Sequence, residues 1–180
     1  LRKENNKILT GYSNRMRTLT ISSDNNLIAG AGEASEIWLW DLDTGVVNCQ
    51  LKGHGSWIRA LSISQDSKLL ASCSEDKSIK IWDIQKQECV KTFAEGFLTW
   101  SLALSPSDNM LISAGEDQLV KYWDIRTGEL IKELSGHSAP IYACRISKSS
   151  RYFATGSFDN TARIWDLQSG ECLHILEGHN

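Results

Sequence analysis

Residues 78–83 read Ser-Ile-Lys-Ile-Trp-Asp, an alternation of polar and apolar side chains that ends in a tryptophan and an aspartate. Such alternation is typical of a β-strand with one buried face. The terminal dipeptide recurs at spacings of 42, 41 and 42 residues, as Trp40-Asp41, Trp82-Asp83, Trp123-Asp124 and Trp165-Asp166. A fixed period of this length indicates one supersecondary unit that is built four times in the 180 residues.

The sequence around this stretch predicts three further strands in the same unit. Residues 57–63 alternate toward their end, residues 68–73 are a short apolar run, and residues 88–93 alternate weakly, as an outer strand does. Short polar residues separate these segments and predict turns. A four-stranded sheet cannot cover its own two faces, so we expect neighbouring units to stack on it.

Charge and hydropathy exclude two classes of partner. The chain has 19 Lys and Arg against 22 Asp and Glu, a net charge of -3, and its basic residues are scattered. A surface that follows a phosphate backbone needs clustered positive charge, so we expect no nucleic acid partner. No apolar stretch approaches the roughly 18 residues of a membrane span, so we expect no membrane partner either.

The five cysteines are an odd number, and most of them align with small or apolar residues of sibling units. These are Cys73, Cys89, Cys144 and Cys172. We therefore interpret them as small core hydrophobes, with a metal or disulfide framework as the alternative. Reduced thiols fit a cytoplasmic or nuclear compartment. We predict no metal site and no cofactor.

Two further motifs accompany the Trp-Asp pairs. Gly-His dipeptides occur at residues 53–54, 136–137 and 178–179, and Ser-Pro-Ser-Asp at residues 105–108 is typical of a turn. With these motifs in register, the chain resembles the WD-repeat (WD40) family of β-propellers over essentially its whole length. The resemblance implies an all-β fold, a β-propeller whose four-stranded antiparallel blades surround a channel.

The repeat divides the chain into four blades with a partial unit at each end. We expect an outer strand of a preceding blade in 1–11, blades in 12–52, 54–94, 97–135 and 137–177, and the start of a further blade in 178–180. An open ring leaves a blade face and a strand edge exposed. Because the chain begins with Leu and ends in mid-pattern, we expect four blades of a larger ring, closed by further blades of the same chain. A second copy that meets it face to face is the alternative.

A histidine, a hydroxyl residue and an aspartate recur in two blades and invite a catalytic interpretation, since hydrolase triads use these groups. The sets are His54, Ser72, Asp76 and Trp82, and one blade on His137, Thr155, Asp159 and Trp165. An enzyme rarely needs two copies of one triad. The WD-repeat resemblance implies a structural tetrad, in which Asp bonds His, His bonds the hydroxyl, and the hydroxyl bonds the indole N–H. We predict no catalytic residue, and an enzyme that uses this network or the channel is the alternative.

The other two blades keep only part of the tetrad. The third blade retains Ser113, Asp117 and Trp123. We align Phe97 with the histidine, so we expect a broken network there with Phe97 packed in its place. The first blade retains Trp40 alone, with Tyr12, Gly30 and Ala34 at the other positions. We therefore expect the first blade to be the loosest of the four.

Two single positions also differ from their siblings. Gln87 stands where glycine holds a turn in the other blades, and glycine tolerates the positive φ that such a turn needs. We expect Gln87 to take the strained conformation or to change the turn type. Trp38 aligns with Lys80, Lys121 and Arg163. It either contacts something outside the four blades or packs within the divergent first blade.

Three columns of residues vary among blades that are otherwise near copies. They are Arg17, Arg59, Trp100 and Tyr142; Arg15, Trp57, Leu98 and Pro140; and Glu33, Glu75, Glu116 and Phe158. The WD-repeat resemblance implies that these twelve residues line one end of the propeller, which we call the upper face. Aromatic side chains and Arg are enriched at interface hot spots. Pairing of Arg59 with Glu75, and packing of Trp57 and Trp100 between blades, is the alternative.

Together these patterns predict a non-enzymatic scaffold or recognition domain that binds a protein or peptide on its upper face. A peptide with a basic or apolar anchor fits the mixture of glutamates and aromatic residues there. Such a domain can be the sensing or docking part of a larger signalling or assembly protein. Fold analogy stops at protein binding, because one scaffold serves many processes.

Overall fold

The computed structural model describes residues 8–106 and 109–178. Within them the chain forms four separate four-stranded antiparallel sheets and no helix. In each sheet the strands follow one another in sequence order, so paired strands are neighbours in the chain. The predicted all-β class with four-stranded antiparallel blades is confirmed.

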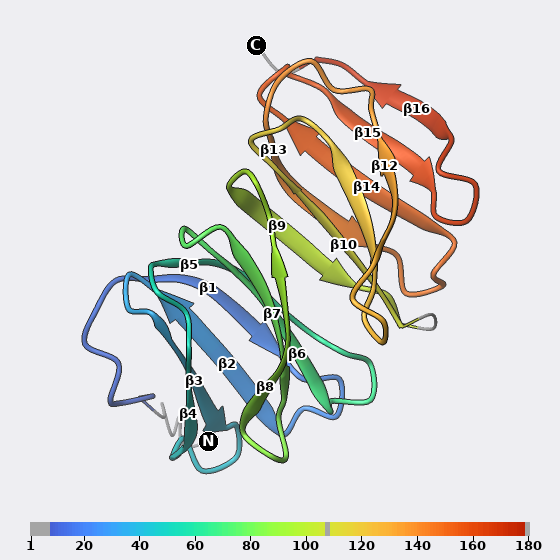
Figure 1. The fold of residues 1–180 in the computed structure, drawn as a ribbon. Coiled ribbons are helices and arrows are strands. Elements are labelled where there is room, and N and C mark those ends of the chain that lie inside the picture. Colours follow the sequence, from blue (N-terminus) through green and yellow to red (C-terminus); the bar gives the residue numbers. More distant parts are fainter. Residues whose placement is uncertain (1–7, 107–108, 179–180) are drawn as a thin grey trace, which may run out of the picture.

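The strands are named in chain order (Figure 1). The first sheet contains β1 (Met16–Ile21), β2 (Leu27–Gly32), β3 (Glu36–Asp41) and β4 (Val47–Lys52). The second contains β5 (Ile58–Ile63), β6 (Leu69–Ser74), β7 (Ser78–Asp83) and β8 (Glu88–Ala94). The third contains β9 (Thr99–Leu104), β10 (Met110–Gly115), β11 (Val120–Asp124) and β12 (Leu130–Leu134). The fourth contains β13 (Ile141–Ile146), β14 (Tyr152–Ser157), β15 (Ala162–Asp166) and β16 (Cys172–Leu176).

Some expectations fall on residues that the structure does not describe. These are residues 1–7, 107–108 and 179–180, which include most of the expected outer strand, half of the predicted Ser-Pro-Ser-Asp turn and most of the further blade start. Ile8 and Leu9 are described and lie in no strand. The proposed blade limits at both ends of the chain stay predictions.

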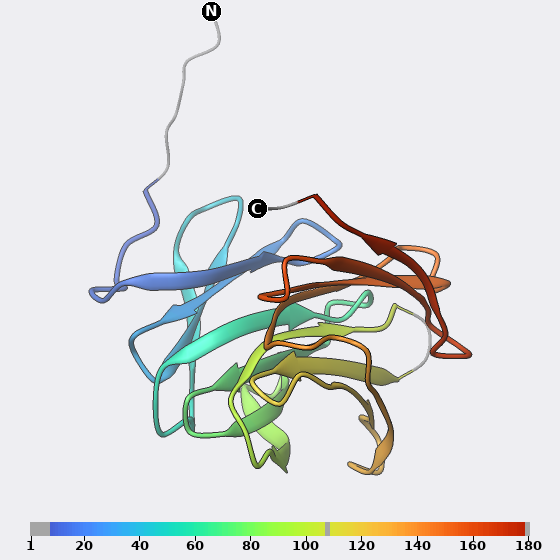
Figure 2. The ribbon, with the colours of Figure 1, turned by 90° about the horizontal axis from the view of Figure 1, so that it is seen from above.

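The sheets stack face to face along an arc, with β1, β5, β9 and β13 in contact in that order (Figures 1 and 2). Apolar side chains from adjoining sheets form a buried cluster at each of the three interfaces. Ile79 and Ile81 of the second sheet, for example, share a cluster with Leu102 and Leu111 of the third. The hydrophobic core therefore lies between the sheets, as expected for units that cannot cover their own faces.

The aspartate of each Trp-Asp pair shapes the turn that follows the third strand. Asp83 Oδ1 accepts a hydrogen bond from the Lys86 N–H at 2.9 Å, and Asp124 Oδ1 accepts one from the Thr127 N–H at 2.8 Å. The turn ends in a left-handed residue, which is glycine in three blades and Gln87, with a φ of 59°, in the second. Gln87 therefore keeps the turn type at a conformational cost on the order of 1 kcal/mol.

All five cysteines are free thiols, and they differ in burial, with Cys49 half-buried. Cys73 and Cys144 are fully buried between sheets, and burial raises the pKa of both thiols, that of Cys144 to about 11. Cys89 and Cys172 are exposed. The interpretation as core residues was wrong for these two, because β8 and β16 are outer strands that no described strand covers on their far edge.

Trp38 packs within the first blade, which confirms the second of its two alternatives. Its ring stacks on Trp40 with centroids 6.0 Å apart and meets Tyr12 edge-on at 6.2 Å. A Cβ on Gly11 would lie 2.5 Å from the Trp38 ring, so a residue without a side chain is required there. Aromatic packing thus occupies the space where the sibling blades place Lys or Arg.

Among the described residues, no sheet covers the side of the first sheet on which Leu19 lies. Leu19 of β1 is 57% exposed, whereas Leu61, Leu102 and Cys144 at the equivalent position are at most 5% exposed. Each of the latter three packs against the preceding sheet, and no described sheet precedes β1. An apolar side chain at this position is therefore buried between two sheets in three blades and exposed in the first.

We expect amide hydrogen exchange to be faster in β1–β3 than in β5–β7, because local opening costs less where apolar contacts are fewer. The measurement is exchange mass spectrometry with fragments that separate the first 45 residues from residues 54–95. Equal protection in the two regions would contradict the greater looseness assigned to the first blade.

Candidate functional site

Two blades contain a complete hydrogen-bonded tetrad. In the second, His54 Nδ1 lies 2.8 Å from Asp76 Oδ2, His54 Nε2 lies 2.7 Å from Ser72 Oγ, and Trp82 Nε1 donates to Ser72 Oγ at 2.8 Å. In the fourth, the corresponding distances among Asp159, His137, Thr155 and Trp165 are 2.7, 2.8 and 2.8 Å. The structure brings together all eight residues assigned to the two networks.

The electrostatics of the second blade assign the protons in its tetrad. Burial lowers the pKa of His54, against the opposing hydrogen bond and charge of Asp76, so the imidazole is neutral. Burial alone would raise the pKa of Asp76, but hydrogen bonds from Ser78, the Gly55 amide and His54 outweigh it and lower the pKa to about 2. The Asp76 carboxylate can only accept, so His54 Nδ1 carries the proton and Nε2 accepts from the Ser72 hydroxyl.

This arrangement fits a structural role better than catalysis. Ser72 is fully buried, so its hydroxyl offers no approach to a substrate, and it is already hydrogen-bonded to both His54 and Trp82. Asp76 also accepts the Gly55 N–H at 2.8 Å, which fastens the loop before the blade to the loop before β7. Leaving any of these buried groups unpaired would cost about 1–3 kcal/mol.

The third blade has a different network from the one expected. Ser113 Oγ accepts from Trp123 Nε1 at 2.9 Å and donates to Glu95 Oε1 at 2.9 Å. Phe97 is 52% exposed. The expectation of a broken network with Phe97 packed inside was therefore wrong, because a glutamate takes the place of the histidine.

A fixed spacing in the sequence identifies Glu95 as the correct equivalent. His54 precedes Ser72 by 18 residues, and His137 precedes Thr155 by the same interval. Glu95 also precedes Ser113 by 18 residues, whereas Phe97 lies two positions too late.

Lys121 completes this network and carries its positive charge. Its Nζ lies 2.6 Å from Glu95 Oε2 and 2.6 Å from Asp117 Oδ2, and all three side chains are almost fully buried. Burial alone would lower the pKa of Lys121, but the bonds and charges of Asp117 and Glu95 outweigh it and raise the pKa. The Phe97 ring centroid lies 6.0 Å from the ammonium.

The first blade satisfies its tryptophan by another route. Trp40 Nε1 donates to the Thr10 carbonyl oxygen at 3.0 Å. The Tyr12 hydroxyl accepts the Ala34 N–H at 3.4 Å and donates to the Arg15 carbonyl at 3.3 Å. Tyr12, Gly30 and Ala34 thus form no tetrad, although Tyr12 still links the entering loop to the blade.

The upper face repeats one backbone geometry in every blade. The residues of one column donate their N–H to the carbonyls of another at 2.8–3.0 Å: Glu33 to Arg15, Glu75 to Trp57, Glu116 to Leu98, and Phe158 to Pro140. The remaining column lies two residues further along each innermost strand, as Arg17, Arg59, Trp100 and Tyr142. The structure therefore places all twelve residues at corresponding positions on one end of the sheets.

Side-chain contacts on this face differ from blade to blade. Arg17 lies 3.0 Å from Glu33, and Arg59 forms an ion pair with Glu75. In the fourth blade the corresponding pair is aromatic, with the Tyr142 and Phe158 rings 5.3 Å apart. The alternative pairing of Arg59 with Glu75 is present and partly buried. Ion pairs near the surface contribute only about 1 kcal/mol, and this pair does not account for the aromatic residues of the other blades.

Aromatic side chains remain open to solvent around these pairs. Trp57 is 39% exposed beneath the Arg17 guanidinium, whose carbon lies 5.0 Å from the ring centroid. Phe158 is 61% exposed and meets the half-buried Trp100 edge-on at 5.7 Å. Packing between blades therefore uses part of Trp100 and leaves apolar surface uncovered beside it.

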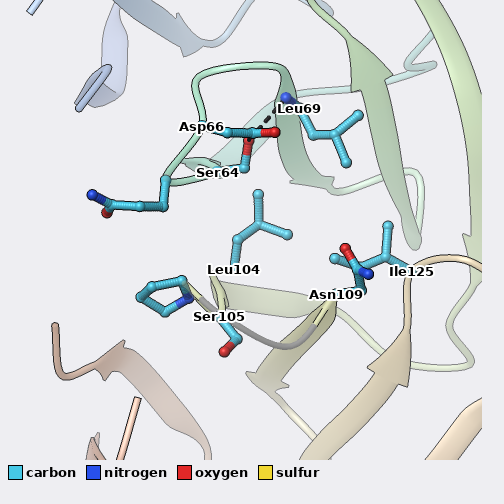
Figure 3. A pocket seen from close by; sticks show the side chains of 9 residues that line it. Ser64, Asp66, Leu69, Leu104, Ser105, Asn109 and Ile125 are labelled. Carbon is cyan, nitrogen blue, oxygen red and sulfur yellow. Dashed lines mark hydrogen bonds between the residues drawn. The ribbon is translucent and has the colours of Figure 1, made fainter. Parts of the chain in front are cut away.

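A separate hollow of about 370 Å³ lies at the opposite end of the second and third sheets (Figure 3). Its lining includes residues of the turn that follows β5, residues that follow β9, and the apolar side chains of Leu69, Leu104 and Ile125. Ser64 Oγ donates to Asp66 Oδ1 at 2.6 Å and accepts the Leu69 N–H at 2.9 Å. The polar groups of Ser64 and Asp66 are thus engaged in holding their own turn.

No group of three or more His, Cys, Asp or Glu side chains in the described chain is arranged to hold a metal ion. Among the same residues, no helix has the length and apolar character needed to cross a bilayer.

The Lys121 network predicts a large effect of one substitution. Lys121→Met should lower the free energy of unfolding by about 3–5 kcal/mol, because it leaves the buried carboxylates of Glu95 and Asp117 without a counter-charge. The measurement is equilibrium denaturation in urea. Lys80→Met is the matched control, since Lys80 fills the same column but bonds Thr92 at an exposed site, and its effect should stay within about 0.5 kcal/mol. Equal losses in the two variants would contradict the network.

Comparison with known proteins agrees with this architecture. The family model for "WD domain, G-beta repeat" matches residues 45–83, 87–124 and 128–166. Each match begins just before the outer strand of one sheet and ends with the third strand of the next. The sequence repeat is therefore displaced by one strand from the structural blade, which ties successive sheets together through the chain.

A solved structure of U3-55K is similar over 96% of this chain and 54% of that chain, with 25% sequence identity and a TM-score of 0.87. The chain thus spans about half the length of that relative. The curated proteins give no match. With three matched repeats and four sheets of the expected kind, the chain belongs to the WD40 repeat family.

Proposed function

We propose that this chain is a non-enzymatic recognition module that binds a protein or peptide on its upper face. WD40 domains are in general protein-interaction scaffolds, and membership of the family supports this class of function. The assignment to the upper face rests on one observation about this chain. Four sheets with the same strand order carry side chains of different charge and size, including exposed aromatic residues, at the same end.

The upper face is favoured as the binding surface because its aromatic side chains are exposed, whereas the hydrogen-bonded networks are buried. The tetrads and the Lys121 network are buried and have their hydrogen bonds satisfied within their own blades. Trp57, Tyr142 and Phe158 instead present apolar rings to solvent. Covering such rings contributes about 25 cal/mol per Å² of apolar area, which makes them anchors for a partner.

An enzymatic role has little support. The histidine–hydroxyl pairs are duplicated, and their hydroxyl groups are buried within the blades, so the networks lack a reactive group that meets substrate. The five free thiols favour a reducing compartment, and we propose the cytoplasm or nucleus as the site of action. A docking or sensing role within a larger signalling or assembly protein is consistent with such a module.

The double variant Arg59→Glu with Trp100→Ala should abolish capture of partner proteins in a pull-down, because it reverses one charge and removes one aromatic anchor on the upper face. Arg126→Glu with Ile131→Ala is the matched control, since both residues are exposed away from that face. Far-UV circular dichroism and thermal melting verify that both variants are folded. Unchanged capture by the upper-face variant, or equal loss in the control, would contradict the proposal.

A further inference from the structure

One blade breaks a pairing rule that the upper face otherwise keeps. Two columns, sixteen residues apart, provide side chains that contact each other: Arg17 with Glu33, Arg59 with Glu75, and Tyr142 with Phe158. In the third blade these columns hold Trp100 and Glu116. An indole cannot supply the guanidinium that the first two blades place beside the glutamate.

Glu116 is therefore a carboxylate without an internal counter-charge. Its backbone N–H bonds the Leu98 carbonyl at 2.9 Å, as its equivalents do in the other blades. Its side chain is exposed and receives the Leu98 N–H at 3.5 Å. Among the described residues no Lys or Arg nitrogen lies within 4.0 Å of it, whereas Glu33 and Glu75 both have such a partner.

Aromatic side chains occupy neighbouring positions in the columns of this face. Trp100 takes the position of the arginine and meets Phe158 of the next blade edge-on at 5.7 Å. Phe158 in turn packs against Tyr142. The same face already holds a guanidinium over an indole, since Arg17 lies 5.0 Å from the Trp57 ring. A carboxylate next to aromatic faces attracts a cation by both charge and ring quadrupole.

We propose that Glu116, Trp100 and Phe158 receive an arginine side chain of the partner protein, an inference that rests on the proposed function and specifies its ligand. The incoming guanidinium pairs with Glu116 as Arg17 pairs with Glu33 and Arg59 with Glu75 in their own blades. Arginine fits better than lysine because its planar guanidinium can bond a carboxylate in two places and stack on an aromatic ring. In the first two blades the glutamate is already paired with an arginine of the same blade. In the third blade Glu116 is available to an arginine of the partner protein.

The test uses the peptide Ac-Gly-Gly-Arg-Gly-Gly-amide and its citrulline counterpart, which has the same shape without the charge. Each is titrated into the protein while the backbone amide NMR signals of Glu116 and Phe158 are followed. We expect the arginine peptide to bind about three- to tenfold more tightly than the citrulline peptide, the range for one exposed ion pair with a cation–π contact. Equal binding of the two peptides would overturn the inference.

Three variants distinguish binding at this site from non-specific binding to the upper face. Glu116→Gln should weaken the arginine peptide about three- to tenfold, whereas Glu75→Gln, in the same column but already paired, should leave its affinity unchanged. Trp100→Arg should abolish binding, because it supplies the missing guanidinium internally. Equal effects of Glu116→Gln and Glu75→Gln, or binding that survives in Trp100→Arg, would contradict the site.

Failure here is distinguishable from failure of the proposed function. If the upper-face double variant loses its partners while Glu116→Gln retains them and both peptides bind alike, the face binds proteins without an arginine anchor. If the double variant keeps its partners, the upper face is not the binding surface and the inference falls with it.

Discussion

The structure depends on a simple constraint, which is that a four-stranded sheet has two apolar faces and can cover neither by itself. The clusters that bury Ile79, Leu102 and Phe153 all combine side chains from two successive sheets. Leu19, which no described sheet covers, is exposed, whereas its equivalents between two sheets are buried. Stability therefore arises mainly at the interfaces between blades, and the ends of the blades remain free to vary.

Within each blade, a buried tryptophan N–H sets a second requirement, and four different acceptors meet it. Ser72 and Thr155 belong to tetrads with histidine, Ser113 belongs to a network with Glu95 and Lys121, and the first blade uses the Thr10 carbonyl. A buried donor without a hydrogen-bond partner lowers the stability of the fold, but different acceptors can serve as that partner. This explains why histidine, serine and aspartate recur here as partners of a buried tryptophan.

The Trp-Asp period and the alternation of apolar residues were enough to predict the class, the strand count and the stacking of units, because both patterns follow directly from geometry. Local substitutions were harder to interpret. The 18-residue spacing contained the information that Glu95 replaces histidine, but matching by residue type led to Phe97. The packing of Trp38 on Tyr12 was not predictable, because it depends on where an irregular loop passes. On the upper face, the three columns of residues could be identified from the sequence. That Glu116 has no Lys or Arg partner among the described residues could be recognised only from the side-chain contacts in the structure.

The dependence of each sheet on its neighbours is tested most directly by removing one contact between two sheets and measuring which sheets lose stability. Leu102 of β9 is buried in the cluster shared by the second and third sheets, and Leu102→Ala should cost about 2–5 kcal/mol. Amide hydrogen exchange of this variant should show lost protection in both β5–β8 and β9–β12, because each sheet loses part of its cover. Loss of protection confined to β9–β12 would show that each sheet is stabilised by its own strands, and would contradict the account.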